Sequence, residues 1–121
     1  MNDKKSLEAC PSSPNCVSSQ SAGEKHNISP ISYNSSSDHA YETILKVLNN
    51  MSGTKVVEEA KDYIRAECKS KWLKVVSDLE FLIDESKKII DVRAASRVGY
   101  TDLGVNRKRI EYIRQKFIQK V

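Results

Sequence analysis

The sequence contains few aromatic residues, little glycine or proline and no long hydrophobic run. Aromatic residues occupy 7% of the 121 positions, and apolar residues together occupy 39%. A membrane-spanning helix is excluded, because no stretch of about 18 apolar residues occurs. No apolar stretch follows the lysines at the start, so we expect no secretory signal and favour the cytoplasm. The length predicts one folded domain, because two would each be too small to bury a core.

Motifs for metal, nucleotide and nucleophilic chemistry are also missing. The three cysteines and two histidines are scattered, so we predict no metal site and no cofactor. Gly99 and Gly104 enclose four residues but lack the Lys-Ser/Thr pair of a phosphate-binding loop. Cys10 and Cys16 have only His26 nearby as a base, which disfavours a cysteine nucleophile.

The composition of the chain changes at about residue 37. Residues 1–37 hold all three prolines and much of the serine, with no sustained helical or strand period. They predict an N-terminal loop segment, packed or partly disordered, ahead of a single α+β domain at 38–121. The stretch between Cys10 and Cys16 is turn-rich, so we predict that the two cysteines are close and form a disulfide if the compartment is oxidising.

Two segments have the apolar spacing of a helix with one buried stripe. The first covers 38–51, with Asp38 as a suitable N-cap and Gly53 where a C-terminal cap would end the helix. The second reaches nearly to the C-terminus and begins at Asp102 or Asn106, since either side chain can cap its start.

Between these helices, four segments alternate apolar and polar residues as strands do. They lie at 54–60, 63–69, 72–84 and 89–98. Their links are as short as hairpin loops, which predicts an antiparallel meander. The predicted fold is an α+β two-layer sandwich of order α-β-β-β-β-α. Both helices cover the apolar face of the sheet, and the N-terminal loop region lies over the other face.

The polar face of this sheet is the main candidate for a site. Strand alternation directs six charged residues to it: Arg65, Glu67, Asp78, Glu80, Arg93 and Arg97. Such residues form cross-strand pairs, which on an open surface contribute only about 0–1 kcal/mol each. The alternative is a polar pocket under the N-terminal segment, where the arginines orient a polar or anionic ligand.

Two further sets of residues carry alternative functions. Asp78 and Glu80 lie two residues apart on one face, so an enzyme could use them as acid and base, although the flanking arginines would lower both pKa values. Asn106 and Arg107 lie where the last strand leads into the last helix. Free N–H groups at a helix start favour an anion there.

The last helix is strongly basic. It holds one acidic residue, Glu111, and six basic ones: Arg107, Lys108, Arg109, Arg114, Lys116 and Lys120. This excess is typical of a solvated helix face or of a surface for an anionic partner. Nucleic acid is disfavoured, because Tyr112 and Phe117 are not interleaved with the cations as a stacking platform requires.

Three stretches of the sequence resemble a known family. They are Cys-Pro-Ser-Ser-Pro-Asn-Cys-Val-Ser-Ser at 10–19, the pair Ile64-Arg65-Ala66-Glu67 and Asp78-Leu79-Glu80-Phe81, and the segment 92–109. Over about residues 7–118 the chain resembles the domain-of-unknown-function family numbered 1499. The resemblance implies a bacterial or photosynthetic source and a family often exported or membrane-anchored, but no reaction. It favours a site at the charged residues, covered by the loop from Cys10 to Cys16.

We therefore predict a non-enzymatic binding module whose charged sheet face holds a small polar or anionic ligand or a partner segment. One alternative is an enzyme that uses Asp78 or Glu80 as acid or base. The other is a structural or interaction module whose charged face only fixes the N-terminal loop in place.

Overall fold

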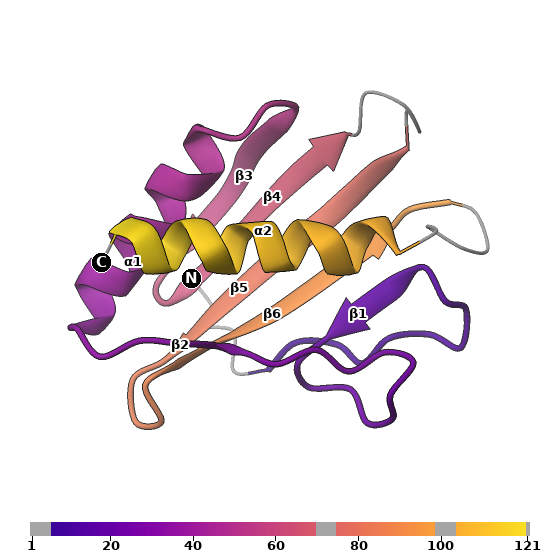
Figure 1. Cartoon of the computed structure of the whole chain (residues 1–121), viewed down its shortest axis with the longest axis horizontal. Coiled ribbons are helices and arrows are strands. Elements are labelled where there is room, and N and C mark those ends of the chain that lie inside the picture. The colour runs from indigo at the N-terminus through magenta and orange to yellow at the C-terminus, as the bar shows by residue number, and fades with distance from the viewer. Residues whose placement is uncertain (1–5, 70–74, 99–103, 121) are drawn as a thin grey trace.

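Two helices lie on one face of a six-stranded sheet in the computed structural model, which describes residues 6–69, 75–98 and 104–120 (Figure 1). In chain order the elements are β1 (Cys16–Ser18), β2 (Ile31–Ser32), α1 (Ser37–Asn49), β3 (Thr54–Ala60), β4 (Tyr63–Lys69), β5 (Val76–Asp84), β6 (Ile89–Ser96) and α2 (Val105–Lys120). Every pairing between these strands is antiparallel. The predicted α+β class with two helices is confirmed.

The number of strands was predicted too low, because the N-terminal segment adds two. The sheet order is β1-β6-β5-β4-β3, and β2 also pairs with β6. Val17 lies opposite Ala94, and Ile31 lies opposite Ile90, so both short strands join the outer edge of β6. They satisfy backbone groups that an edge strand would otherwise expose. With only two or three residues each, neither can show a strand period in the sequence.

The core lies between the helices and the apolar face of the sheet. Ile44 and Leu48 of α1 and Phe117 of α2 are fully buried against strand residues such as Phe81. The N-terminal segment contributes to the same cluster through residues such as Ile31. This burial is what holds α1 and α2 on the sheet, because packing of an apolar face stabilises most protein helices.

The boundaries of α1 differ from the sequence prediction at both ends. Ser36, not Asp38, is the N-cap, and its side-chain oxygen accepts a hydrogen bond from the His39 N–H at 3.1 Å. Asp38 lies in the first turn, where its charge is favourable to the positive end of the helix. The helix ends at Asn49, so Gly53 is not its cap. Gly53 instead forms the turn into β3, with φ of +71°.

The start of α2 also corrects one prediction. The helix begins at Val105, and Asn106 lies inside its first turn with a fully buried side chain, so Asn106 is not a cap. Asp102, the other proposed cap, lies outside the described residues. Strand β6 ends at Ser96, two residues before the predicted end.

The N-terminal segment wraps around the β6 edge and reaches both faces of the sheet. Cys10 and Cys16 form a disulfide with Cα atoms 5.6 Å apart, which confirms the predicted proximity of these cysteines. On the face away from the helices, Leu7 is buried against Tyr63 and Leu82. The predicted cover of that face is therefore present over part of the sheet.

Removing the disulfide should destabilise the fold moderately. We expect the Cys10→Ala, Cys16→Ala double variant to lose about 2 kcal/mol of unfolding free energy, because the unfolded chain gains the freedom of a short loop. Urea denaturation measures this loss. A reductant should destabilise the wild type by a similar amount and leave the double variant unchanged. Equal stability of wild type and variant would show that the bond does not constrain the unfolded chain.

Candidate functional site

The strand registers place five of the six charged residues of the sequence prediction on one face of the sheet, and Arg97, just after β6, joins them through ion pairs to Glu67 and Asp78. Glu80 of β5 lies opposite Arg65 of β4 and opposite Arg93 of β6. Two residues further along these strands, Glu67 of β4 lies opposite Asp78 of β5, and both point to the same face as Glu80. Directly opposed residues in antiparallel strands share a face, so their side chains all point away from the helices.

Strand β3 extends this arrangement through a β-bulge. The register shifts between Val56 and Glu58, so that Lys55 lies opposite Glu67 and Glu58 lies opposite Arg65. A bulge redirects the side chains that follow it. One row across the sheet then alternates in charge, with Glu58 beside Arg65. Sequence reasoning missed Glu58, because a bulge breaks the two-residue period that such reasoning relies on.

Three residues at the centre of this face form a buried group, which we call the inner cluster: Tyr63, Glu80 and Arg93. The Tyr63 hydroxyl donates to Glu80 Oε2 at 2.6 Å, and Arg93 Nη1 donates to Glu80 Oε1 at 3.4 Å. The side chains of Glu80 and Arg93 are only 9% and 14% exposed. A carboxylate buried to this extent requires such partners, because desolvation of an unpaired charge is costly.

The N-terminal segment supplies part of the cover over the inner cluster. Leu7 packs on Tyr63, and its N–H donates to Gln20 Oε1 at 2.7 Å. Gln20 in turn donates to Asp91 Oδ2 at 3.0 Å, and Ser19 donates to Asp91 Oδ1 at 2.7 Å. The segment is thus held by polar contacts to β6 beside the inner cluster. Sequence alternation directs Tyr63 and Asp91 to this face, but nothing in it indicates their partners.

Four residues beside the inner cluster form a more open network, which we call the outer cluster: Arg65, Glu67, Asp78 and Arg97. Asp78 Oδ1 accepts from Arg65 Nη1 at 3.0 Å and from Arg97 Nη2 at 2.9 Å. Arg97 also donates to Asp78 Oδ2 through Nε and to Glu67. The Arg97 side chain is 45% exposed, whereas that of Asp78 is 26% exposed. Asp78 is therefore the fixed centre of this network.

These contacts shift the pKa values of the groups involved. Hydrogen bonds from Arg97, supported by the charges of Arg97 and Arg65, lower the pKa of Asp78 despite its partial burial. Hydrogen bonds to the carboxylates of Asp78 and Glu67 raise the pKa of Arg97. Burial, and then the hydrogen bond to Glu80, raises the pKa of Tyr63. All of these shifts keep the groups in their ordinary charge states at neutral pH.

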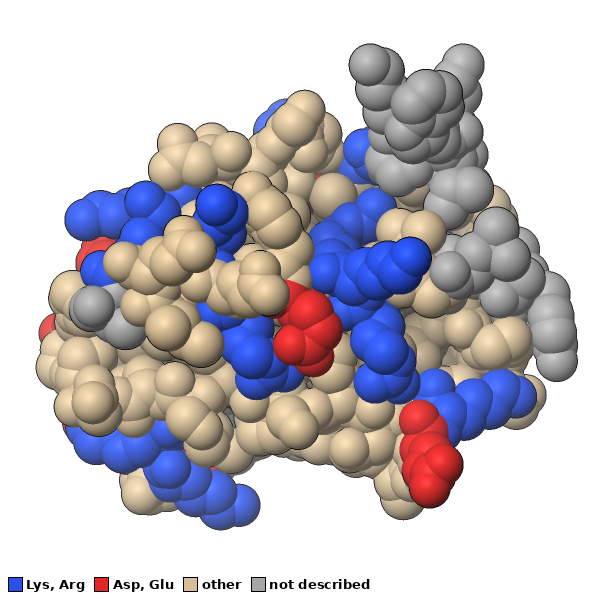
Figure 2. Space-filling view, in the orientation of Figure 1, with Lys and Arg blue, Asp and Glu red and all other residues tan. Residues whose placement is uncertain are grey.

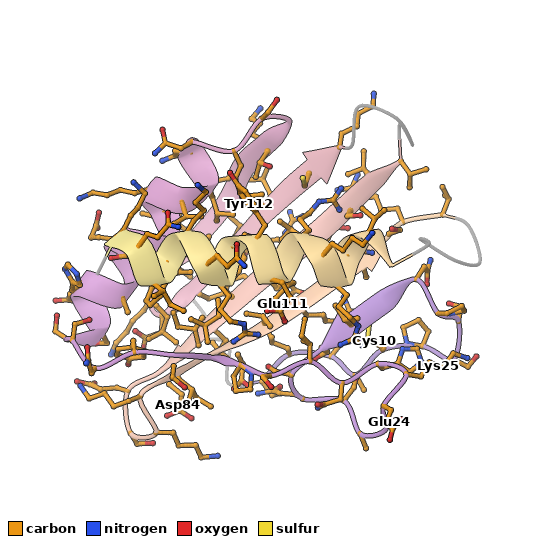
Figure 3. The ribbon with its side chains drawn as sticks, viewed as in Figure 1. Cys10, Glu24, Lys25, Asp84, Glu111 and Tyr112 are labelled. Carbon is orange, nitrogen blue, oxygen red and sulfur yellow. A yellow bond between two sulfur atoms is a disulfide. The ribbon has the colours of Figure 1, made fainter. Side chains whose placement is uncertain are left out.

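The two remaining candidates, Asn106 and Arg107, lie away from this face. Asn106 Nδ2 donates to the Asn15 carbonyl at 3.2 Å and to Ser96 Oγ at 3.0 Å. Arg107 contacts carbonyls of the N-terminal loop that carries Glu24 and Lys25, which Figure 3 labels. Both residues therefore attach the N-terminal segment to the start of α2, and they do not join the outer cluster.

No group of three or more histidine, cysteine or acidic side chains is placed to hold a metal ion among residues 6–69, 75–98 and 104–120. Neither helix in these ranges is long and apolar enough to cross a membrane.

Comparison with known proteins identifies the family. A family model described as protein of unknown function (DUF1499) matches residues 6–117, which is nearly the whole chain. The chain belongs to this family. The DUF1499 match contains the inner cluster, the outer cluster and both cysteines of the disulfide. Searches of curated proteins and of solved structures find no match.

Loss of Arg93 should damage the fold far more than loss of Arg97. We expect Arg93→Ala to lower the unfolding free energy by about 3–5 kcal/mol, because it leaves the Glu80 carboxylate buried without its guanidinium partner. Arg97→Ala removes an exposed side chain and should cost much less. Chemical denaturation of both variants measures the difference. Equal losses would contradict the division into an inner and an outer cluster.

The acid sensitivity of the fold should depend in part on Asp78. Its lowered pKa means that the ionised form contributes stability above the unfolded-state pKa of about 3.9, and that this contribution disappears as the pH falls through the native pKa. Unfolding free energies measured from about pH 6 down to about pH 2 should therefore fall more steeply for the wild type than for Asp78→Asn. Parallel curves would show that Asp78 has the same pKa in both states.

Proposed function

We propose that the protein is a non-enzymatic binding module that holds a small polar ligand with one anionic group at the outer cluster. The observation that carries this proposal is the exposure of a paired arginine. Arg97 has a fixed partner in Asp78 and a half-exposed partner in Glu67. The Arg97 guanidinium can release the Glu67 carboxylate and bind a ligand carboxylate in its place, while it keeps its contacts with Asp78.

The energetic cost of this exchange is small. Glu58 and Glu67 are the outer partners of the arginines, and their side chains are 52% and 36% exposed. Exposed ion pairs contribute only about 0–1 kcal/mol, so their replacement costs little. A ligand that makes two parallel hydrogen bonds to one guanidinium gains more than a single contact provides.

The floor of the proposed site lies at Ala95. This small residue stands on β6 opposite Asp78, between Arg93 and Arg97, whose side chains are much longer. Arg93 Nε is buried and has no hydrogen-bond partner among the residues that the structure describes. Cys16 lies opposite Ala95 on the other side, so the disulfide borders the same position. A ligand above Ala95 would meet donors from both arginines.

The balance of positive and negative groups on the face favours a ligand with a single negative charge. Asp91 holds the N-terminal segment, and the four carboxylates in the rows of the two clusters, Glu58, Glu67, Asp78 and Glu80, are matched by three guanidiniums and Lys55. A polyanion would therefore meet as many negative as positive groups. A singly charged anion or a zwitterion fits better, because it can pair with an arginine while its cationic or neutral part faces the released carboxylate. The carboxylate end of a partner segment offers the same chemistry.

The enzyme alternative has less support. An acid or base needs a pKa near the working pH. Arg97 and Arg65 instead lower the pKa of Asp78. The Glu80 carboxylate is occupied by Tyr63 and Arg93 and is nearly buried. The structural alternative applies to the inner cluster, which lies beside the attachment of the N-terminal segment, but it leaves the exposure of Arg97 unexplained.

A ligand screen with a matched pair of variants tests the proposal. Calorimetric titration with amino acids, monocarboxylates, short peptides and, for comparison, citrate and phosphate esters should identify a singly anionic or zwitterionic binder. Arg97→Gln should weaken its binding by roughly tenfold or more, because a hydrogen bond to a charged group is lost. Lys87→Gln, which removes one exposed charge in the β5–β6 hairpin, should not. Equal binding by both variants, or preferred binding of polyanions, would refute the assignment.

A further inference from the structure

The outward surface of α2 carries three lysines that the fold does not use. Lys108, Lys116 and Lys120 have no ion-pair partner among the described residues. At a rise of about 1.5 Å per residue they extend over about 18 Å of the helix. Glu111, the acidic residue of α2, is already paired with Arg114 at 2.9 Å.

The arginines of α2, in contrast, are committed to the fold. Arg114 donates to two main-chain carbonyls of the N-terminal segment, at 2.7 and 2.6 Å. Arg107 lies within hydrogen-bonding distance of two further carbonyls of that segment. Arg109 donates to the Asn106 side chain at 3.0 Å. The helix therefore uses arginine for contacts within the fold, whereas Lys108 and Lys120 are exposed and Lys116 is half-buried.

An exposed aromatic ring stands among these lysines. Tyr112 is 46% exposed and lies on the side of α2 towards α1, whereas Glu111 lies on the side towards the N-terminal segment (Figure 3). Lys116 Nζ is 5.4 Å from the centre of the Tyr112 ring. With Val47 of α1 and Met51, which follows that helix, this ring lines a groove of about 230 Å³. We call the following residues the lysine face: Lys108, Tyr112, Lys116 and Lys120.

The two broad surfaces of the molecule differ in charge. In the view onto α2, Lys and Arg side chains predominate, and few acidic ones are visible (Figure 2). On the opposite surface, the carboxylates and cations of the sheet face balance one another. Such a charge difference orients a protein in the field of an anionic surface, with α2 facing that surface.

We propose that the lysine face docks on an anionic lipid bilayer. Lysines bury their aliphatic stems and keep their ammonium groups at the headgroups, and tyrosine rings are favoured at the membrane interface. Three lysines near such a surface contribute roughly a hundredfold to the binding constant. The sheet face, with the outer cluster, then points away from the membrane and stays accessible. This proposal does not depend on the function proposed for the outer cluster.

The geometry favours a bilayer over an acidic protein segment. A peptide helix needs a long apolar groove, whereas the groove beside Tyr112 holds only about 230 Å³. Lys116 and Lys120 line that groove, whereas Lys108 does not, so the three lysines extend along the helix beyond it.

Co-sedimentation of the full, disulfide-bonded chain with lipid vesicles tests the proposal. Vesicles of phosphatidylglycerol and phosphatidylcholine in equal parts should bind the protein at low salt, and pure phosphatidylcholine vesicles should not. The triple variant Lys108→Gln, Lys116→Gln, Lys120→Gln should bind the anionic vesicles roughly a hundredfold more weakly. Its matched control changes three exposed lysines outside α2 and should bind within a few-fold of the wild type: Lys61→Gln, Lys69→Gln and Lys87→Gln.

Two further measurements separate the proposal from its rivals. Tyr112→Ala should weaken vesicle binding but leave the melting temperature unchanged, because the ring is exposed. Soluble polyglutamate, as an acidic protein mimic, should bind more weakly than the anionic vesicles. The proposal is overturned if the anionic vesicles do not bind, if both triple variants weaken binding equally, or if polyglutamate binds more tightly and independently of Tyr112.

Discussion

The antiparallel register of β4, β5 and β6 determines which side chains form the core and which form the charged face. Because side chains alternate along a strand, this register places Phe81 and Val92 against the helices and directs Glu80 and Arg93 to the other face. A slip of one residue would bury the charges and expose the core. Strand β6 also pairs with β1 and β2 on its outer edge, so it joins the N-terminal segment to the rest of the sheet.

Burial divides the charged face into two parts with different roles. In the inner cluster, Glu80 and Arg93 are shielded from water, so each requires the other and the pair contributes to a defined structure. In the outer cluster, Arg97 is half exposed, so its contacts can be exchanged at little cost. The N-terminal segment contributes to this division, because Leu7 packs on Tyr63 of the inner cluster.

Much of this arrangement could be predicted from the sequence, because its main signals are local. The two-residue period correctly directed Arg65, Glu80 and Arg93 to one face, and helical spacing identified both helices. What could not be predicted depends on tertiary contacts. Strands β1 and β2 are too short for a period and exist because β6 offers an unpaired edge. The bulge that brings Glu58 beside Arg65 breaks the local pattern, and the burial of Asn106 depends on a distant carbonyl.

In the proposed complex, a ligand anion lies above Ala95 between the guanidiniums of Arg93 and Arg97. The most direct measurement is an NMR titration that follows the side-chain Nε–H signals of Arg65, Arg93 and Arg97 while glutamate or acetate is added. We expect the signals of Arg97 and Arg93 to shift together and saturate, while the Arg114 signal, from α2, stays constant. Shifts of equal size at all four arginines, or no saturable shift at Arg97, would contradict this expectation.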